Sequence, residues 1–440
     1  MKLSGWGNLP RAEVRILRAA SRHEAEMAVA TEPSLIARGN GRAYGDAALN
    51  PAATLSMLPC DRLIDFDEQS GFITCEAGLL LSDLLDLLVP RGWFPPVTPG
   101  TRFVTIGGMA AADVHGKNHH VAGSFGAHID EILLATPEGG VLRCSRRENV
   151  DLFDATIGGM GLTGVILTVR FRLTRIETAY IRQRTERAAD LAQAMALFDA
   201  HPEASYSVAW IDCLAKGPAL GRSLVYFGEP ARFDELPEKR RRAPLVLSKA
   251  RAVTVPVDLP AFLLNRFTVG AFNQLYYRRA REGERLIDYR RYFYPLDALL
   301  GWNRLYGRRG FLQYQCVLPR AASLAGMTAL LQRISRSGLG SFLAVLKSMG
   351  PAAPLGMLSF PLDGFTLALD FPAHRGSIEL LAELDSITAN HGGRLYLAKD
   401  ARGSPAMMAH YPRFEAFRAK RREIDPAGKF SSLLSQRLGL

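Results

Sequence analysis

Cysteine is scarce in this sequence of 440 residues. The five that occur are Cys60, Cys75, Cys144, Cys213 and Cys316. Their number is odd, and no two of them are spaced as metal ligands or as a redox pair. We therefore expect buried thiols in a reducing compartment and no disulfide framework.

Long hydrophobic runs are also missing. The longest apolar stretch, residues 77–89, is interrupted by Asp83 and Asp86 and is too short to span a bilayer. The N-terminal MKLSGWGNLPRAEV has no apolar core behind its charge, so we expect no signal peptide. No low-complexity stretch occurs, which is typical of a globular chain. These features predict a cytoplasmic protein, or one peripheral at the inner membrane, without a transmembrane helix.

Acidic residues are fewer than basic ones: the sequence has 43 acidic and 54 basic residues, which gives a net charge of +11. Such an excess suits nucleic acid, an anionic membrane face or phosphorylated ligands. The basic residues concentrate in residues 239–242 and 278–291, and no recognised DNA-reading module accompanies them. The sequence therefore disfavours a nucleic-acid partner.

Glycine turns separate short apolar runs in the first ~175 residues, as in an α+β nucleotide-binding domain. We predict strands at residues 35–37, 55–57, 63–66, 72–75, 132–135 and 165–171, and a helix over residues 79–88. Later in the chain we predict strands at 206–211, 311–318 and 365–371, and helices at 321–335, 376–391 and 415–424. Residues 218–294 are poorly periodic, basic and aromatic, and we interpret them as long mobile loops.

Three glycine-rich segments carry the chemistry: ARGNGRAYGDAALN, PGTRFVTIGGMAAADVHGKNHH and TIGGMGLTGVI. Glycine allows the backbone to approach a ligand closely and to bind phosphate through N–H groups. Three such loops indicate an extended dinucleotide. The third contains G-x-G-x-x-G, but the alternating, β-branched run VILTVRFRL follows it where a Rossmann site needs a helix. We reject the Rossmann interpretation.

These residues resemble the vanillyl-alcohol-oxidase-type (PCMH-type) FAD-binding family. Residues 39–46 correspond to its first pyrophosphate loop, residues 105–108 to the second, and residues 158–165 to the adenine-ribose side. Within the family, the runs VHGKNHH (114–120), FLQYQ (311–315) and LYLAKD (395–400) are most similar to the decaprenylphosphoryl-ribose 2-oxidase branch. The resemblance covers nearly the whole chain.

The resemblance implies an α+β fold: a two-part PCMH-type FAD-binding domain and an antiparallel-sheet substrate domain with flanking helices. We expect the FAD-binding domain in residues 1–176 and 395–440, and the substrate domain in residues 177–394. The residues expected at FAD are Gly39, Asn40, Gly41, Arg42, Ala43, Tyr44, Gly45, Asp46, Pro99, Gly100, Thr101, Thr105, Ile106, Gly107, Gly108, Ala112, His115, Gly116, Asn118, Gly161, Gly164, Val165, Ile166 and Tyr396.

The activity that the resemblance implies is FAD-dependent oxidation of the C2 hydroxyl of a polyprenylphosphoryl pentose to a 2-keto sugar. This is the first half of an epimerisation, which a short-chain dehydrogenase/reductase partner completes. Two alternatives remain: an alditol or aldonolactone oxidase acting on free polyols, and a non-catalytic flavin-binding subunit. The basic-aromatic middle of the chain favours the lipid-linked substrate.

Three positions depart from the family pattern. Members with covalent FAD carry histidine where this chain has Arg42, so we predict non-covalent FAD. The mycobacterial enzymes have a cysteine two residues before Asp-Phe-Pro, where this chain has Ala368, and Phe293 replaces a tyrosine near Pro-Leu-Asp. Both changes alter the wall of the substrate pocket.

Lys399, His115, Lys117 and Tyr44 are the candidate catalytic residues. We predict that Lys399 lies at the end of an apolar strand, where a lone lysine usually reaches out to solvent. Beside a flavin, a fixed cation instead stabilises the negative charge gained with hydride, and a lysine of lowered pKa accepts a hydroxyl proton. The candidates for substrate binding are Lys117, Gln313, Gln315, Lys347, Tyr396, Lys399 and Trp210.

Two further patterns allow more than one interpretation. The spacing of His115, His119 and His120 suits a metal, but no carboxylate or cysteine cluster accompanies them, so we expect no metal. Residues 252–272 are apolar between the two basic clusters. They form either part of the substrate-domain core or a surface that docks on an anionic membrane and admits a lipid tail.

Overall fold

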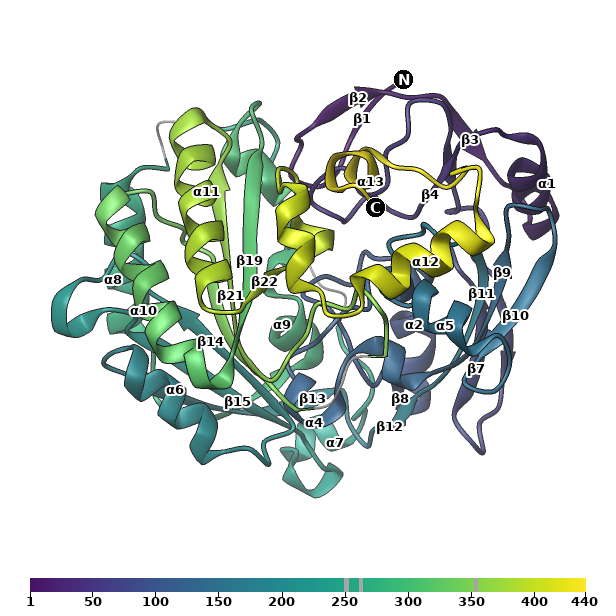
Figure 1. Ribbon diagram of the computed structural model, residues 1–440. Helices are drawn as coiled ribbons and strands as arrows, with labels where there is room; N and C mark the ends of the chain where they lie inside the picture. Colours follow the sequence, from purple (N-terminus) through teal and green to yellow (C-terminus); the bar gives the residue numbers. More distant parts are fainter. Residues whose placement is uncertain (249–252, 261–263, 352–354) are drawn as a thin grey trace.

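A five-stranded and an eight-stranded sheet organise the two halves of the molecule (Figure 1). The computed structural model describes residues 1–248, 253–260, 264–351 and 355–440. The first sheet belongs to the N-terminal half of the chain and the second to the middle. The mixture of helices and antiparallel sheets confirms the expected fold class.

The five-stranded sheet has the order β10-β9-β11-β7-β6, with all neighbours antiparallel. Helix α1 packs on one side, and the short helix α3 packs against β7 and β11. The Thr105 side chain begins α3 by accepting a hydrogen bond from Gly108 N. The elements are α1 (Arg22–Thr31), β6 (Leu63–Phe66), β7 (Phe72–Glu76), α2 (Leu81–Leu88), α3 (Ile106–Ala111), α4 (His119–Ala122), β9 (Ile129–Ala135), β10 (Val141–Ser145), α5 (Val150–Thr156) and β11 (Val165–Arg172).

A small parallel sheet presents the first glycine loop. Its order is β3-β5-β4, and β4 (Ile36–Arg38) ends directly before Gly39. The central strand β5 (Thr54–Ser56) pairs with β4 on one side and with β3 (Ile16–Arg18) on the other. Because β4 is held by its pairing with β5, the position at which the glycine loop begins, Gly39, is fixed.

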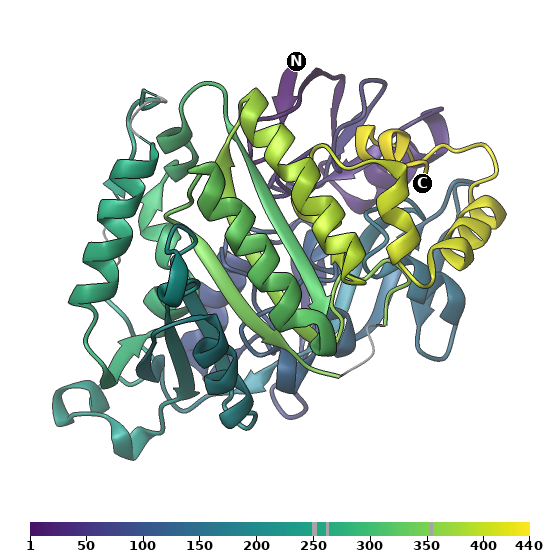
Figure 2. The same cartoon turned by 60° about the vertical axis from the view of Figure 1, so that its left-hand side comes forward.

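The eight-stranded antiparallel sheet has the order β17-β13-β15-β14-β20-β21-β19-β22. Helices α6, α10 and α11 cover one of its faces, and Figure 2 shows α10 and α11 lying across it. The opposite face is free for a ligand. The elements are β13 (Tyr180–Ala188), α6 (Leu191–Ala200), β14 (Tyr206–Ile211), β15 (Ser223–Pro230), β17 (Gly283–Asp288), β19 (Phe311–Pro319), α10 (Arg320–Ser337), β20 (Ala344–Met349), β21 (Gly364–Pro372), α11 (Arg375–Asn390) and β22 (Arg394–Leu395).

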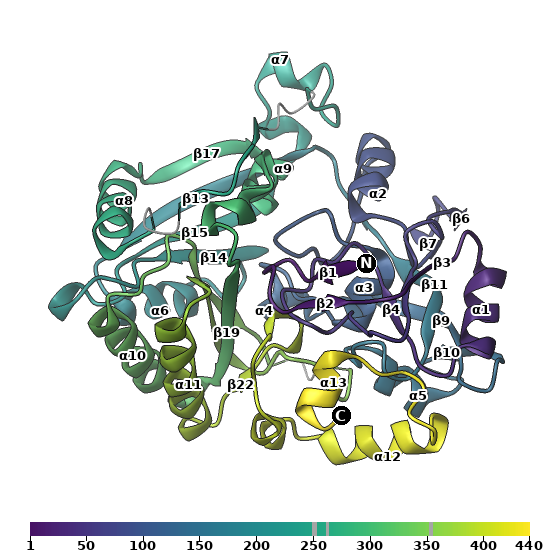
Figure 3. The ribbon, with the colours of Figure 1, turned by 90° about the horizontal axis from the view of Figure 1, so that it is seen from above.

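The C-terminal segment returns to the first half of the molecule (Figure 3). After α12 (Phe414–Ile424), Phe430 forms a parallel bridge with Leu35, and α13 (Leu433–Leu438) follows. Arg437 of α13 pairs with Asp46 at 2.7 Å and with Asp400 at 2.8 Å. One guanidinium thus links the first glycine loop, the segment after Lys399 and the end of the chain.

The strands and helices predicted from periodicity are confirmed, with ends shifted by at most three residues. Two local predictions are wrong. Residues 218–294 are not a run of loops, because they contain β15, α8 (Arg266–Arg279), β17 and α9 (Tyr289–Phe293). Lys399 does not end a strand: β22 stops at Leu395, and Lys399 lies in a 3-10 turn, Leu397–Lys399.

The apolar segment 252–272 falls partly outside the described residues, at 252 and 261–263. Its described part does not form core, since Val255 and Val269 are buried but most neighbours are exposed, among them Phe267 at 71%. No helix of the described ranges is long and apolar enough to cross a bilayer.

Candidate active site

A cavity of about 610 Å³ is lined by both halves of the molecule. One wall consists of the glycine-rich loops, and the other is the uncovered face of the eight-stranded sheet. The turn that carries Lys399 closes one end. The volume suits a ligand site for an extended cofactor with a substrate beside it.

Most residues predicted at FAD line this cavity, and so do all seven predicted at the substrate. The lining includes residues 39–44 and 99–101, Thr105, Gly107, Gly108, Ala112, His115, Gly116, Gly161, Gly164, Ile166 and Tyr396, and also Lys117, Trp210, Gln313, Gln315, Lys347 and Lys399.

Five residues predicted at FAD do not line the cavity, and each has a structural place instead. Ile106 and Val165 are fully buried core residues, and Gly45 packs against the Asp400 backbone. Asp46 pairs with Arg437, and the Asn118 side chain donates to Pro96 O at 2.7 Å. These five residues are adjacent in the sequence to residues that line the cavity, but their own atoms contact other parts of the protein.

The first glycine loop fits the pyrophosphate of FAD. Among the described atoms, the backbone N–H groups of residues 40–43 have no hydrogen-bond acceptor, although they line the cavity. Consecutive free N–H groups form a site for an anion. Gly39 is required because a Cβ there would lie 2.2 Å from Thr105 Oγ1, and Gly41 has a φ of +63°. The N–H groups of Gly107 and Gly108 already donate within the protein.

Arg42 lies across this loop with its guanidinium 4.1 Å from the centre of the Trp6 ring. Its Nε is buried and has no partner among the described atoms. Burial lowers the pKa of Arg42, and the charges of Asp297 and Tyr44 act in the opposite direction. A cation with a free donor in this place suits a phosphate or a flavin carbonyl.

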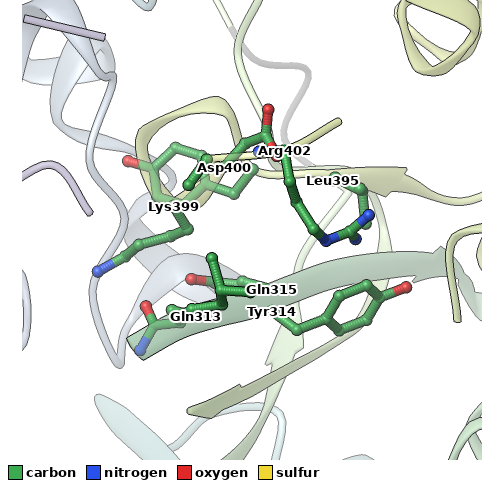
Figure 4. Close-up of a pocket in the computed structure, with 10 residues that line it drawn as sticks. Gln313, Tyr314, Gln315, Leu395, Lys399, Asp400 and Arg402 are labelled. Carbon is green, nitrogen blue, oxygen red and sulfur yellow. The ribbon is translucent and has the colours of Figure 1, made fainter. Parts of the chain in front are cut away.

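Lys399 is held at the closed end of the cavity between Tyr44 and β19. Its Nζ lies 3.9 Å from the centre of the Tyr44 ring, and in Figure 4 its amine extends to the same side as the Gln313 side chain, away from Tyr314. Burial lowers the pKa of Lys399, whereas the nearby Asp370 carboxylate raises it. This amine can therefore hold or release a proton close to neutral pH.

Asp370 is the nearest carboxylate to act on Lys399. It is fully buried on β21, directly opposite Gln313, whose Nε2 donates to its Oδ1 at 2.6 Å. Oδ2 has no hydrogen-bond partner in the described part of the chain. Burial raises the pKa of Asp370, and the hydrogen bond from Gln313 and the charge of Lys399 lower it.

His115 is a neutral hydrogen-bonding centre in this cavity. Its Nε2 lies 3.0 Å from Gln315 Nε2, its Nδ1 lies 3.1 Å from Lys347 Nζ, and Tyr396 packs at 5.5 Å between ring centres. Burial, with the charge of Lys347, lowers the pKa of His115 well below its usual value. His119 and His120 have other partners, Gly350 N and Ala204 O.

Two more lysine amines face the cavity. Burial lowers the pKa of Lys117 to about 7, and its Nζ donates to Tyr292 O while lying 4.3 Å from that ring's centre. Burial, with the charges of Lys117 and Lys399, lowers the pKa of Lys347 to about 7. No group of three or more metal-ligating side chains occurs in the described residues.

Comparisons with known proteins agree with this geometry. A model of the FAD binding domain family matches residues 16–145. The chain is 38% identical over 452 residues to decaprenylphosphoryl-β-D-ribose oxidase of Mycolicibacterium smegmatis. The alignment covers 100% of this chain and 97% of that protein. It belongs to that FAD-dependent oxidoreductase family. An uncharacterised Streptomyces coelicolor protein is 37% identical over 374 residues, 82% of this chain and 100% of its own.

Membership makes this chain an FAD-dependent oxidoreductase that acts on a CH–OH group. L-Gulonolactone oxidase of Mus musculus is 32% identical over 133 residues, but the match covers only 30% of each chain. A match of that length reflects one shared part of the two proteins and carries no argument about the substrate.

Sequence reasoning missed two carboxylates of this oxidoreductase. Asp370 lies beside Lys399, and Asp297 lines the cavity while binding Thr101 Oγ1 at 2.7 Å and Arg102 N at 2.8 Å. Each belongs to a short run, Asp-Phe-Pro or Pro-Leu-Asp. The comparison with the family used these runs only to locate Ala368 and Phe293. The side-chain hydrogen-bond partners of these two carboxylates, Thr101 and Gln313, lie more than 50 residues away from them in the sequence.

Proposed function

We propose that this protein oxidises the C2 hydroxyl of a polyprenylphosphoryl pentose to a 2-keto sugar, the first half of an epimerisation. The observation that carries the proposal is one cavity with a phosphate-binding glycine loop on one wall and Lys399, Gln315 and Lys347 on the other. The M. smegmatis relative, named for oxidation of decaprenylphosphoryl ribose, is similar along the whole chain.

FAD, when bound, supplies the acceptor for the hydride that leaves C2. The N–H groups of residues 40–43 would hold its pyrophosphate, and Arg42 would bind an adjacent oxygen. The flavin is bound without a covalent link, because Arg42 offers no nucleophile and no cysteine lines the cavity in the described ranges. Acid precipitation should then release all yellow colour, and colour retained in the pellet would contradict this.

The polar side chains of the sheet face would orient the pentose. The amides of Gln313 and Gln315 and the amine of Lys347 can hydrogen-bond its hydroxyls. Lys399 would serve the reaction in one of two ways: as a neutral amine it accepts the C2 hydroxyl proton, and as a cation it stabilises developing negative charge. Tyr44 and Tyr396, both buried, exclude water from that end.

A partner and a location follow from this reaction. The 2-keto sugar needs a reductase to complete an epimerisation, so we propose a short-chain dehydrogenase/reductase partner. We also propose that the protein is cytoplasmic or peripheral at the inner membrane. Helix α8 exposes Phe267 near its start and Leu275 near its end and carries Arg278 and Arg279 in its last turn, a composition suited to an anionic lipid surface. Residues 1–176 with 395–440, and residues 177–394, are the proposed domains.

Flavin bleaching tests the proposed function directly. Purified holoprotein is mixed without oxygen with a farnesylphosphoryl pentose, with the free pentose, and with a free polyol. Bleaching by the lipid-linked sugar, with a 2-keto product found by mass spectrometry, is the expected result. Bleaching by the polyol alone would instead identify an alditol oxidase, and no bleaching by any of the three would contradict the proposal.

A further inference from the structure

One face of the eight-stranded sheet continues well beyond the candidate sugar site. Register places the side chains of Gln315, Ala368, Val345 and Trp210 on this face, each directly opposite the next across β19, β21, β20 and β14. The same face extends over β15, β13 and β17, and all these strands contribute to the cavity lining. The far end carries chemistry that the proposed reaction does not use.

Arg285 lies at this far end, on the edge strand β17. It stands directly opposite the buried Gln183 on β13. Exchanging the oxygen and nitrogen of the Gln183 amide satisfies its neighbours better, and in that orientation the oxygen accepts from Arg285 Nη2 at 3.0 Å and from Nε at 3.3 Å. Among the described side chains, no carboxylate forms an ion pair with Arg285, although the adjacent Glu284 pairs with Arg182. Arg285 is therefore an oriented guanidinium with its charge uncompensated and open to the cavity.

Two tyrosine hydroxyls meet beside this guanidinium. Tyr226 of β15 and Tyr276 of α8 lie 3.0 Å apart at their hydroxyl oxygens, and the Tyr276 ring packs on Trp210 at 4.8 Å between centres. When one hydroxyl donates to the other, the second proton is free for a ligand. Burial raises the pKa of Tyr226, and the nearby Arg285 charge lowers it by less, so the Tyr226 hydroxyl keeps its proton at neutral pH.

We propose that Arg285, Tyr226 and Tyr276 form a phosphate-binding subsite for the phosphodiester that joins sugar and lipid in the substrate. This proposal rests on the proposed function, in which the substrate carries one phosphodiester anion. Tyr226 lies two strands from Lys347 in the sheet order, a distance of about 10 Å. A pentose over β20 and β14 therefore places its 1-phosphate over β15, within reach of Arg285.

The flavin does not explain these groups. Its phosphates belong on the opposite wall, at the N–H groups of residues 40–43, whereas β17 and β15 lie on the sheet wall. Arg285, with the one free hydroxyl proton, matches one phosphodiester: the guanidinium binds the two non-bridging oxygens, and the hydroxyl donates to a second lone pair of one of them. The subsite would select lipid-phosphate sugars over free polyols.

Farnesyl phosphate, which has the lipid and the phosphate but no sugar, tests the subsite apart from the reaction. Its binding to the FAD-loaded protein is measured by calorimetry for the wild type, Arg285→Ala, Tyr226→Phe and the control Arg375→Ala. Arg375 is 93% exposed, and Glu379 is its one ion-pair partner among the described residues, so the control removes the same charge away from the cavity. We expect about tenfold or greater weakening in Arg285→Ala, a smaller loss in Tyr226→Phe and no change in the control.

Two results would overturn the subsite. One is equal binding by the wild type and Arg285→Ala, with FAD content unchanged. The other is no detectable binding of farnesyl phosphate by the wild type. Failure of the proposed function has a different signature, because Arg285-dependent binding would persist while no lipid-linked pentose bleaches the flavin. If both stand, Arg285→Ala raises the KM for the lipid-linked pentose about tenfold and leaves the bleaching rate at saturation within about threefold.

Discussion

Buried lysines determine the chemistry of this cavity at the scale of single residues. Lys117 and Lys347 each have a pKa lowered to about 7, and burial also lowers the pKa of Lys399. An exposed lysine is charged at neutral pH, whereas these amines can change protonation during turnover. Only Lys399 has a buried carboxylate, Asp370, among the causes of its pKa shift. The charges of the two groups therefore act on each other, although no ion pair joins them among the described residues.

Replacing Lys399 by Ala should slow flavin bleaching by substrate by about 10²–10³-fold, because one preorganised charge or proton acceptor is lost. Lys399→Arg should not restore the rate, since its guanidinium is larger and keeps its proton. Stopped-flow absorbance measures the rate after FAD content is verified. A Lys399→Ala rate within about threefold of the wild type would make Lys399 structural.

The pH dependence of bleaching distinguishes the two roles of Lys399. If the neutral amine acts as a base, the rate rises as pH passes its pKa; if the cation acts, the rate falls there. The Asp370 carboxylate raises the pKa of Lys399, so Asp370→Asn should move either limb to lower pH. Rates of wild type and variant are compared from pH 6 to about pH 9. If the pH at which the bleaching rate changes is the same in the wild type and Asp370→Asn, the change belongs to another group, such as Lys117 or Lys347.

At the scale of elements, the loop after β4 is shaped to present N–H groups rather than side chains. Arg38, the last residue of β4, is tied down by donating to Ser4 O at 2.7 Å and Ala48 O at 3.3 Å. Gly41 lies against this guanidinium with a φ of +63°. A side chain at Gly41 would meet an arginine that has little freedom to move away.

Gly41→Ala should weaken FAD binding at least tenfold. Its Cβ would lie 2.3 Å from Arg38 Nη2, and the shift needed would turn the neighbouring N–H groups from the pyrophosphate. Gly217→Ala is the matched control, because Gly217 has a φ of +60° and nothing within 4 Å of an added Cβ. Both variants should lose about 1 kcal/mol of stability from backbone strain. Titration of apoprotein with FAD measures the difference, and equal affinities would contradict the loop assignment.

At the scale of the whole molecule, Arg437 ties distant segments together at the cavity. Its guanidinium contacts Asp46, which follows the first glycine loop, and Asp400, which follows Lys399. The Asp46 and Asp400 side chains are only 4% and 3% exposed. The C-terminal helix thus positions the phosphate-binding loop and the reactive amine together.

Arg437→Ala should reduce the free energy of unfolding by about 2–3 kcal/mol, because two buried carboxylates lose their partner. It should also weaken FAD binding. The control Arg375→Ala breaks an exposed pair and should cost under about 1 kcal/mol. Denaturant unfolding of both holoproteins compares them. Equal midpoints would mean that the C-terminal helix is dispensable for this arrangement.

Much of the fold followed from local pattern. The helices α10 and α11 have buried residues at helical spacing, and the strand β14 is a short, continuously buried apolar run, so local pattern found them. The helix α8 was missed because it buries only Val269 and Asn273 and shows no apolar stripe. The strand β17 was missed because half of its residues are exposed and none is buried, and because it pairs with β13 alone. A strand or helix that packs against one neighbour only needs few apolar residues, so its sequence shows no clear periodic pattern.

The sequence by itself determined the glycine-rich loops, the cofactor that they suit, and the side chains around Lys399. Glycine is needed where backbone meets a ligand, and that requirement is local and visible in the chain. Tertiary structure alone decided which charges face one another. The charge of Asp370 on β21 acts on Lys399 in the turn after β22, and the charge of Arg285 on β17 acts on Tyr226 on β15, because segments distant in the sequence come together in the fold. Electrostatic partners depend on distance in space, which no local pattern encodes.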